Sequence, residues 1–402
     1  MFLNLKDYFT DSVLQAPTIG CMLMCLVAAL VGTFVVLRGK SLIGETLSHA
    51  AYPGVIIALL CERYFFINSE YELLVLSSVL IGAVTSCLAG VYLIELLEKS
   101  FRVPADAALS FVLSSFFGIG ITVLSALQQD FPTLYKELQA YLFGQAATMR
   151  DIHVIIYACL ALLVIIFILI YFREIQALLF DPIFADLIGI KRKKIEALLF
   201  CMLVLAVVIG IRSCGVVLMS AMLIFPAACA RQFTNKLSTL LALAALFGIV
   251  CGYFGVVLSH EMSLFFWQGV GKVSSFPTGP MIVLLAALIF FISILFSNRG
   301  GVVLRVVRKI NFSWQCQQEN LLKIIWKICS KKKSPIVTYQ EIEPMWHTKG
   351  LSLKITLFML TRRGWLKKRG VMGYSLTALG MLWGRKIVRL HRLWEVYLVD
   401  YC

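Results

Sequence analysis

The sequence predicts an all-α polytopic membrane protein with about nine transmembrane helices, followed by a small cytoplasmic domain. Of its 402 residues, 60% are hydrophobic and 15% are charged, against about 45 to 50% and about 25% in soluble domains. The net charge of +15 lies entirely in the tail, because residues 1–298 carry 17 basic and 17 acidic side chains while residues 299–402 carry 20 and 5. This composition excludes a soluble globule, a collagen-like chain and a disordered chain.

Nine apolar runs approach the length of about 20 residues that a spanning helix needs. They cover residues 18–37, 46–61, 73–97, 105–127, 152–172, 195–212, 214–230, 237–258 and 279–297. The second run is the shortest and begins with polar residues, and only Arg212 and Ser213 separate the sixth run from the seventh. We therefore expect a transmembrane domain over residues 1–298.

The basic residues of the short loops predict the orientation of these helices. One alternate set of loops holds eleven Lys and Arg, and the other set, which includes the N-terminus, holds six. Because loops rich in Lys and Arg stay in the cytoplasm, the N-terminus is expected outside the membrane and the tail in the cytoplasm.

An acid and a histidine stand at the start of the second apolar run. Ionisable residues inside a membrane are costly, so Glu45 and His49 are candidates for function. Four residues apart, they share one helix face and together offer oxygen and nitrogen ligands to a divalent metal such as manganese, iron or zinc. The alternative is that both lie at the membrane surface as an ordinary charged helix start. Pro53 and Gly54 favour the first interpretation, since a broken helix at depth usually lines a cavity.

No nucleotide-binding loop accompanies these residues. Gly39-Lys40-Ser41 resembles the end of a P-loop, but the position that must be glycine is Phe34. We therefore expect no enzyme activity in this chain, and any ATP hydrolysis to belong to a separate subunit.

A loop segment from Asp181 to Gly189 is predicted to form a short helix that docks in a cleft of a partner. Small residues at Ala185 and Gly189 allow close approach, and Gly189 is typical of a helix end. A plain positive-inside loop is the alternative.

The tail predicts a basic linker at residues 299–335 and a globular domain at residues 336–402. Its order of elements is helix 340–346, helix 351–362, a hairpin around residues 370–374 and helix 377–401. That order indicates a winged helix-turn-helix whose second helix enters a DNA groove. Lys354, Arg362 and Arg363 are the expected DNA contacts, and binding of the basic tail to anionic membrane lipid is the alternative.

Four segments resemble the permeases of ABC importers for manganese, zinc or iron. The pattern Ser-Leu-x-Gly-Asp-x-x-Ser-His-Ala-x-x-Pro-Gly is met at residues 41–54 with Glu45 in place of Asp, and further matches lie at residues 181–189, 215–231 and 277–280. The resemblance implies a bacterial inner or cytoplasmic membrane, a second permease subunit, two ATPase subunits and an extracytoplasmic metal-binding protein. It implies that Glu45 and His49 contact the transported metal, with no permanently bound cofactor, and that Asp181, Ala185 and Gly189 belong to the segment that contacts the ATPase.

The end of the tail resembles the metal-responsive regulators of the diphtheria-toxin-repressor class, whose His-Arg-Leu-x-Glu pattern is met from His391 to Glu395. The resemblance implies metal ligation by these two residues, although the helix that follows in that class is absent. The main hypothesis is therefore a metal importer permease, with manganese or iron preferred. A membrane-tethered DNA-binding regulator and an ion-coupled carrier are the alternatives.

Overall fold

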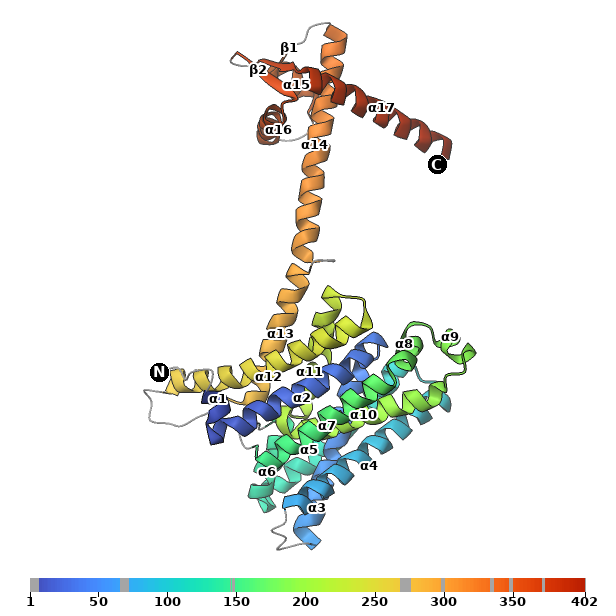
Figure 1. Ribbon diagram of the computed structural model, residues 1–402, viewed down its shortest axis with the longest axis vertical. Helices are drawn as coiled ribbons and strands as arrows, with labels where there is room; N and C mark the ends of the chain where they lie inside the picture. Colours follow the sequence, from blue (N-terminus) through green and yellow to red (C-terminus); the bar gives the residue numbers. More distant parts are fainter. Residues whose placement is uncertain are drawn as a thin grey trace. The chain divides into compact units, whose positions relative to one another are not determined.

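The computed structural model describes residues 7–65, 72–144, 146, 149–267, 276–297, 301–332, 336–346, 350–370 and 373–401. The chain divides into two compact units, Met1–Gly301 and Val302–Cys402, which are helical and mixed respectively (Figure 1).

The first unit is a bundle of long apolar helices. Its helices are α1 (Asp7–Thr10), α2 (Ser12–Leu37), α3 (Leu42–Phe65), α4 (Glu72–Lys99), α5 (Ala105–Asp130), α6 (Pro132–Phe143), α7 (Asp151–Ile170), α8 (Phe172–Phe180), α9 (Pro182–Leu187), α10 (Arg192–Cys214), α11 (Val216–Phe233), α12 (Leu237–Trp267) and α13 (Thr278–Phe296). Among the described residues, eight helices are long and apolar enough to cross a membrane, and α11 contributes a shorter apolar helix at Leu218–Phe233. The nine apolar runs of the sequence correspond to these nine helices.

Proline and glycine set several of the helix boundaries. Pro132 and Pro182 are first residues of helices, a position where the missing N–H of proline costs no hydrogen bond. Gly215 separates α10 from α11 with a φ of +85°, and a side chain there would meet the backbone of residues 142–144. The sequence analysis predicted this boundary at Arg212 and Ser213. It falls at Gly215 instead, because only glycine fits both that conformation and that space.

The helices α2 and α3 form the centre of the bundle. The spanning part of α2 is 72% buried and that of α3 is 78% buried, whereas the values for α4 and α13 are 22% each. Glycines allow the backbones to approach: a Cβ atom on Gly54 of α3 would collide with the carbonyl oxygen of Gly82 on α4. Close packing through small residues is the usual way in which membrane helices associate, so α3 is held firmly against its neighbours.

The second unit contains a three-stranded sheet and four α-helices. The elements are α14 (Val302–Lys332), β1 (Ile336–Thr338), α15 (Tyr339–Ile342), the 3-10 helix η2 (Glu343–Met345), α16 (Gly350–Arg362), β2 (Leu366–Arg369), β3 (Gly373–Leu376) and α17 (Ala378–Tyr401). The strand order is β1-β3-β2 and both pairings are antiparallel, with Tyr374 opposite Val337 on one side and Lys368 on the other. A buried core joins α14, α16 and the sheet through Leu321, Ile325, Val337, Ile342, Leu353, Leu357, Leu360 and Leu366.

Two features of this unit differ from the sequence prediction. Most of the segment expected as a basic linker, residues 299–335, is the helix α14, because Leu321, Leu322 and Ile325 share one face that the domain buries. The strand β1 was not expected. It is three residues long and depends on pairing with β3, a contact between distant residues that no local pattern encodes.

Candidate functional site

Glu45 and His49 lie one turn apart in the first half of α3. The helix follows a tight turn at Gly39, whose φ of +67° is accessible to glycine. Glu45 is partly buried, and His49 is only 7% exposed. The rings of His49 and Phe117 of α5 meet edge to face, with their centroids 4.6 Å apart. The pair predicted from the sequence is therefore brought together on one face of a central helix.

The Nδ1 atom of His49 is buried and accepts no hydrogen bond from any described residue. The polar side chains near it in sequence are already satisfied by backbone carbonyls: Thr46 donates to Leu42 at 2.9 Å and Ser48 donates to Gly44 at 2.8 Å. A buried polar atom without a partner is rare and costly in a native protein. His49 is therefore available to an incoming ligand.

The described residues hold no group of three or more His, Cys, Asp or Glu side chains able to bind a metal together. One carboxylate and one imidazole are ligands that manganese, iron and zinc accept, but two residues do not complete a coordination shell.

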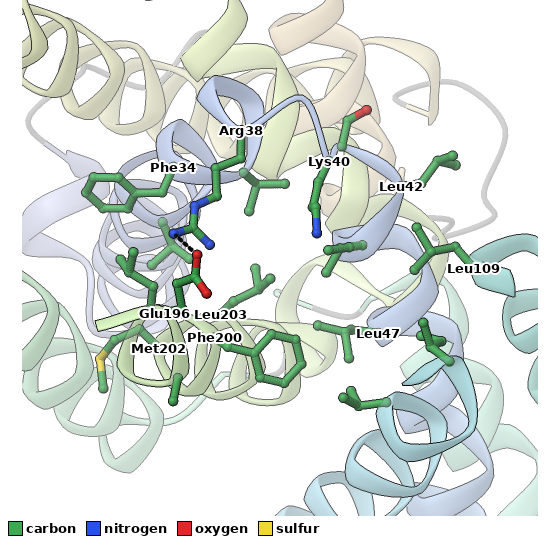
Figure 2. A pocket seen from close by; sticks show the side chains of 18 of the residues that line it. Phe34, Arg38, Lys40, Leu42, Leu47, Leu109, Glu196, Phe200, Met202 and Leu203 are labelled. Carbon is green, nitrogen blue, oxygen red and sulfur yellow. Dashed lines mark hydrogen bonds and ion pairs between the residues drawn. The ribbon is translucent and has the colours of Figure 1, made fainter. Parts of the chain in front are cut away.

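A cavity of about 730 Å³ opens beside the start of α3, at the ends of α2, α4, α5, α7 and α10. Figure 2 shows Leu47 and Leu109 on one side of it and Phe34, Arg38 and Glu196 on the other. The Arg38 Nη2 atom lies 3.4 Å from the Glu196 Oε1 atom. Burial lowers the pKa of Arg38 while Glu196 opposes that effect, and arginine stays protonated in proteins. The cavity is therefore lined by both apolar and charged side chains.

The segment predicted to contact a partner, residues 181–189, contains the helix α9. The Asp181 carboxylate caps it by accepting hydrogen bonds from the backbone N–H groups of Ile183 and Phe184, at 3.1 and 3.0 Å. Ala185 is fully buried, and Gly189 ends the segment with a φ of +82°. The outer face of the segment is apolar, with four large side chains 51 to 80% exposed, namely Ile183, Phe184, Leu187 and Ile188.

The residues predicted to act in the tail are spread over two helices. Lys354 and Arg362 are exposed on α16, and the exposed Arg363 lies over the ring of Trp365 at 5.4 Å. His391 on α17 has its Nδ1 atom 3.0 Å from the Nζ atom of Lys323 on α14. The side chain of Glu395 lies outside the described part of the structure, so the proposed His391 and Glu395 pair stays a prediction.

Two polar groups of the first unit were missed by the sequence analysis. One is the contact of Arg38 with Glu196, which are 158 positions apart. The other joins Tyr8 of α1 to the end of α12, where its hydroxyl donates to the Glu261 Oε1 atom at 2.9 Å and lies 3.2 Å from the His260 Nδ1 atom. Sequence spacing cannot identify partners that lie this far apart in the chain.

Together these features define a class. Multi-pass transport proteins typically have helices that span a membrane, an ionisable pair on a central helix and an exposed apolar helix on a connecting loop. The chain belongs to the ABC 3 transport family, whose model matches residues 10–297. Membership of a family of ABC transporters removes the ion-coupled carrier from the candidates.

The relatives of this chain are named as components of metal transport systems. It is 30% identical to the manganese transport system membrane protein MntC of Bacillus subtilis (strain 168), over 94% of this chain and 82% of that protein. It is 34% identical to the zinc transport system membrane protein TroC of Treponema pallidum (strain Nichols), over 76% of this chain and 96% of that protein. Among solved structures it resembles PsaBC from Streptococcus pneumoniae in complex with Fab, with a TM-score of 0.60 and 27% identity, covering 73% of this chain and 96% of the matched chain.

Proposed function

We propose that this protein is the permease subunit of an ATP-binding-cassette importer for a divalent first-row metal. The observation that carries the proposal is the buried, unpartnered Nδ1 atom of His49, one helical turn from the carboxylate of Glu45. The names of the relatives support manganese or zinc as cargo. The resemblance of the tail to iron- and manganese-responsive regulators is the reason to prefer manganese or iron over zinc.

In this proposal the membrane is a bacterial inner or cytoplasmic membrane, with the N-terminus outside and the tail inside. A second permease copy or homologue completes the path and supplies further ligands to the metal. An extracytoplasmic binding protein delivers the metal, and two ATPase subunits hydrolyse ATP. The exposed apolar face of α9 supports contact with an ATPase subunit, because four large apolar side chains in water otherwise lower solubility.

The chain's own residues then act as transient ligands. A neutral His49 supplies a nitrogen lone pair, and Glu45 supplies a negative oxygen that offsets the charge of the metal. Two such ligands do not complete a coordination shell, so in this proposal the second permease copy supplies the others, and the metal is released when the helices move. Tight binding would slow its passage.

The test is metal accumulation in cells that supply the partner subunits. Elemental analysis compares wild type with Glu45→Gln, His49→Ala and the control Glu62→Gln, which alters an acid at the other end of α3. We expect the first two variants to lose accumulation of one metal by about tenfold or more, the scale seen even for residues that only orient ligands. Normal accumulation in well-expressed Glu45→Gln and His49→Ala would contradict the assignment of this pair.

A second candidate function, a membrane-tethered DNA-binding regulator, is favoured by the basic surface of the second unit. The helix α16 ends at Arg362, Arg363 follows it, and β2 comes next with Lys367, Lys368 and Arg369 all exposed. A helix followed by a basic hairpin is the arrangement with which winged helix-turn-helix domains hold DNA, the hairpin contacting phosphates without reading sequence.

Deleting residues 302–402 separates the two functions. This removes the whole second unit, whereas a cut at residue 331 would leave the α14 part of its core exposed. Metal uptake is expected to persist under the importer proposal, and its loss with the first unit intact would favour the regulator. The triple variant Lys367→Gln, Lys368→Gln and Arg369→Gln serves as a folded control that removes only charge.

The start of α14 supports a contact of the tail with membrane lipid. It begins only a few residues after α13, and Val302, Val303, Val306, Val307 and Ile310 form an apolar stripe that is 38 to 49% exposed. Arg308 lies on the opposite side of the helix, and Arg305 and Lys309 flank the stripe next to Val302. An amphipathic basic helix next to a spanning helix binds the surface of an anionic leaflet.

A further inference from the structure

A chain of charged residues joins the α9 segment to the turn before α3. The Oε1 atom of Glu196 on α10 contacts two arginines, accepting from the Arg192 Nε atom at 3.1 Å and lying 3.4 Å from the Arg38 Nη2 atom. The Arg192 Nη1 atom is 4.0 Å from the Asp186 Oδ2 atom on α9. The order is thus Asp186, Arg192, Glu196 and Arg38, two acids alternating with two bases. Figure 2 shows the contact of Arg38 with Glu196 across the wall of the cavity.

Stability alone does not account for this arrangement. The four side chains are between 28% and 55% exposed, and ion pairs in contact with water contribute little to folding because solvent screens them. These contacts differ from ordinary surface ion pairs because they link separate segments of the chain. Arg192 and Glu196 are on one helix, but Asp186 and Arg38 belong to separate segments that these two residues tie together.

The turn that carries Arg38 is short and hydrogen-bonded. Arg38 is the C-cap of α2, where its N–H donates to Phe34 O at 3.1 Å, and the Lys40 N–H donates to Val35 O at 3.2 Å. The Ile43 N–H then donates to Lys40 O at 3.1 Å, which joins the turn directly to the first turn of α3. A displacement of Arg38 therefore moves the start of the helix that carries Glu45 and His49.

We propose that Asp186, Arg192, Glu196 and Arg38 form a relay that transmits movement of α9 to the start of α3. This inference rests on the proposed importer function and names positioning residues, none of which contacts the metal. When the ATPase partner shifts α9, Arg192 moves with it and displaces the carboxylate of Glu196. Arg38 binds the same carboxylate, so the turn at residues 38–41 moves as well. Loss of the shared carboxylate leaves ATP hydrolysis intact but disconnects it from the metal path.

The experiment is a double-mutant cycle in the assembled importer, reconstituted in liposomes with its ATPase partner. Manganese transported and ATP hydrolysed are measured for wild type, Arg38→Gln, Glu196→Gln and the double variant. Each single variant is expected to transport about fivefold less metal per ATP, the lower range of typical coupling between distant sites. The double variant is expected to be no worse than the worse single one, because both substitutions break the same link.

Two controls separate the relay from a general effect of charge. The first control is the double variant Glu95→Gln and Lys99→Gln. It removes an ion pair within α4, with the Lys99 Nζ atom 2.7 Å from the Glu95 Oε2 atom, at the border of the same cavity. The amount of metal transported per ATP hydrolysed is expected to be unchanged. Arg38→Lys keeps the charge and is expected to retain more coupling than Arg38→Gln, which a merely structural role of the side chain would not require.

Wild-type coupling in Arg38→Gln and Glu196→Gln, or losses that multiply in the double variant, would overturn the relay. Failure of the wild-type importer to move any metal would instead refute the proposed function, so the two failures are distinguishable.

Discussion

At the scale of single residues, one buried tyrosine ties the N-terminal helix to the end of α12. Tyr8 is fully buried, and its hydroxyl donates to Glu261 while it contacts His260. Burial, and then the hydrogen bond to Glu261, raises the pKa of Tyr8. The neutral hydroxyl therefore remains a donor. Its contribution to stability is complete below the ordinary tyrosine pKa of about 10 and is lost progressively as the pH rises from there through the raised pKa of the folded state.

We expect Tyr8→Phe to lower the free energy of unfolding by about 1 to 2 kcal/mol, since it removes the donor of a partly buried hydrogen bond to a carboxylate. Thermal unfolding of the purified protein in detergent measures the change. Tyr92→Phe, at a side chain that is 70% exposed, is the matched control. Equal unfolding temperatures for the two variants would show that the Tyr8 contact contributes nothing.

The ionisable pair on α3 was predicted from residue spacing, and its environment was not. A spacing of four residues places Glu45 and His49 on the same face of an α-helix. Whether that face meets lipid, water or protein depends on the neighbouring helices. The buried state of His49 and its contact with Phe117, 68 positions later, follow from the packing of α3 against α5.

At the scale of elements, the close approach of α3 to α4 depends on facing glycines. A Cβ atom on Gly82 would lie 2.5 Å from the Gly54 carbonyl oxygen and 2.8 Å from the Ala58 Cβ atom. Real Cβ atoms do not approach backbone this closely, so the helices would have to separate. The position of α3, and with it the position of Glu45 and His49, relies on this contact.

Gly82→Ala is therefore expected to destabilise the first unit by about 1 to 3 kcal/mol, the usual range for overpacking, and to lower metal uptake together with expression. The control is Gly118→Ala on α5, where an added Cβ atom meets nothing within 4 Å. Fluorescence-detected size exclusion after heating compares the two. A Gly82→Ala protein as stable as Gly118→Ala would contradict the predicted collision.

At the scale of the whole molecule, the chain combines a membrane part, residues 1–298, of zero net charge with a strongly basic tail. The contrast was visible in the sequence, because residues 299–402 carry 20 basic and 5 acidic side chains. The division found in the structure falls at Gly301, close to the expected end of the transmembrane domain at residue 298. The second unit begins with a helix and not with a linker, because the end of α14 is part of the core of that unit.

The sequence by itself determined the membrane class, the apolar helices, the pairing of Glu45 with His49 and the capped segment from Asp181 to Gly189. These features depend on hydrophobicity and on residue spacings within one or two turns, which local physics decides. Only the tertiary structure decided the boundary at Gly215, the strand β1, the burial of His49 and the contact of Arg38 with Glu196. Each of these depends on residues distant in the chain, whose proximity is a property of the packed molecule.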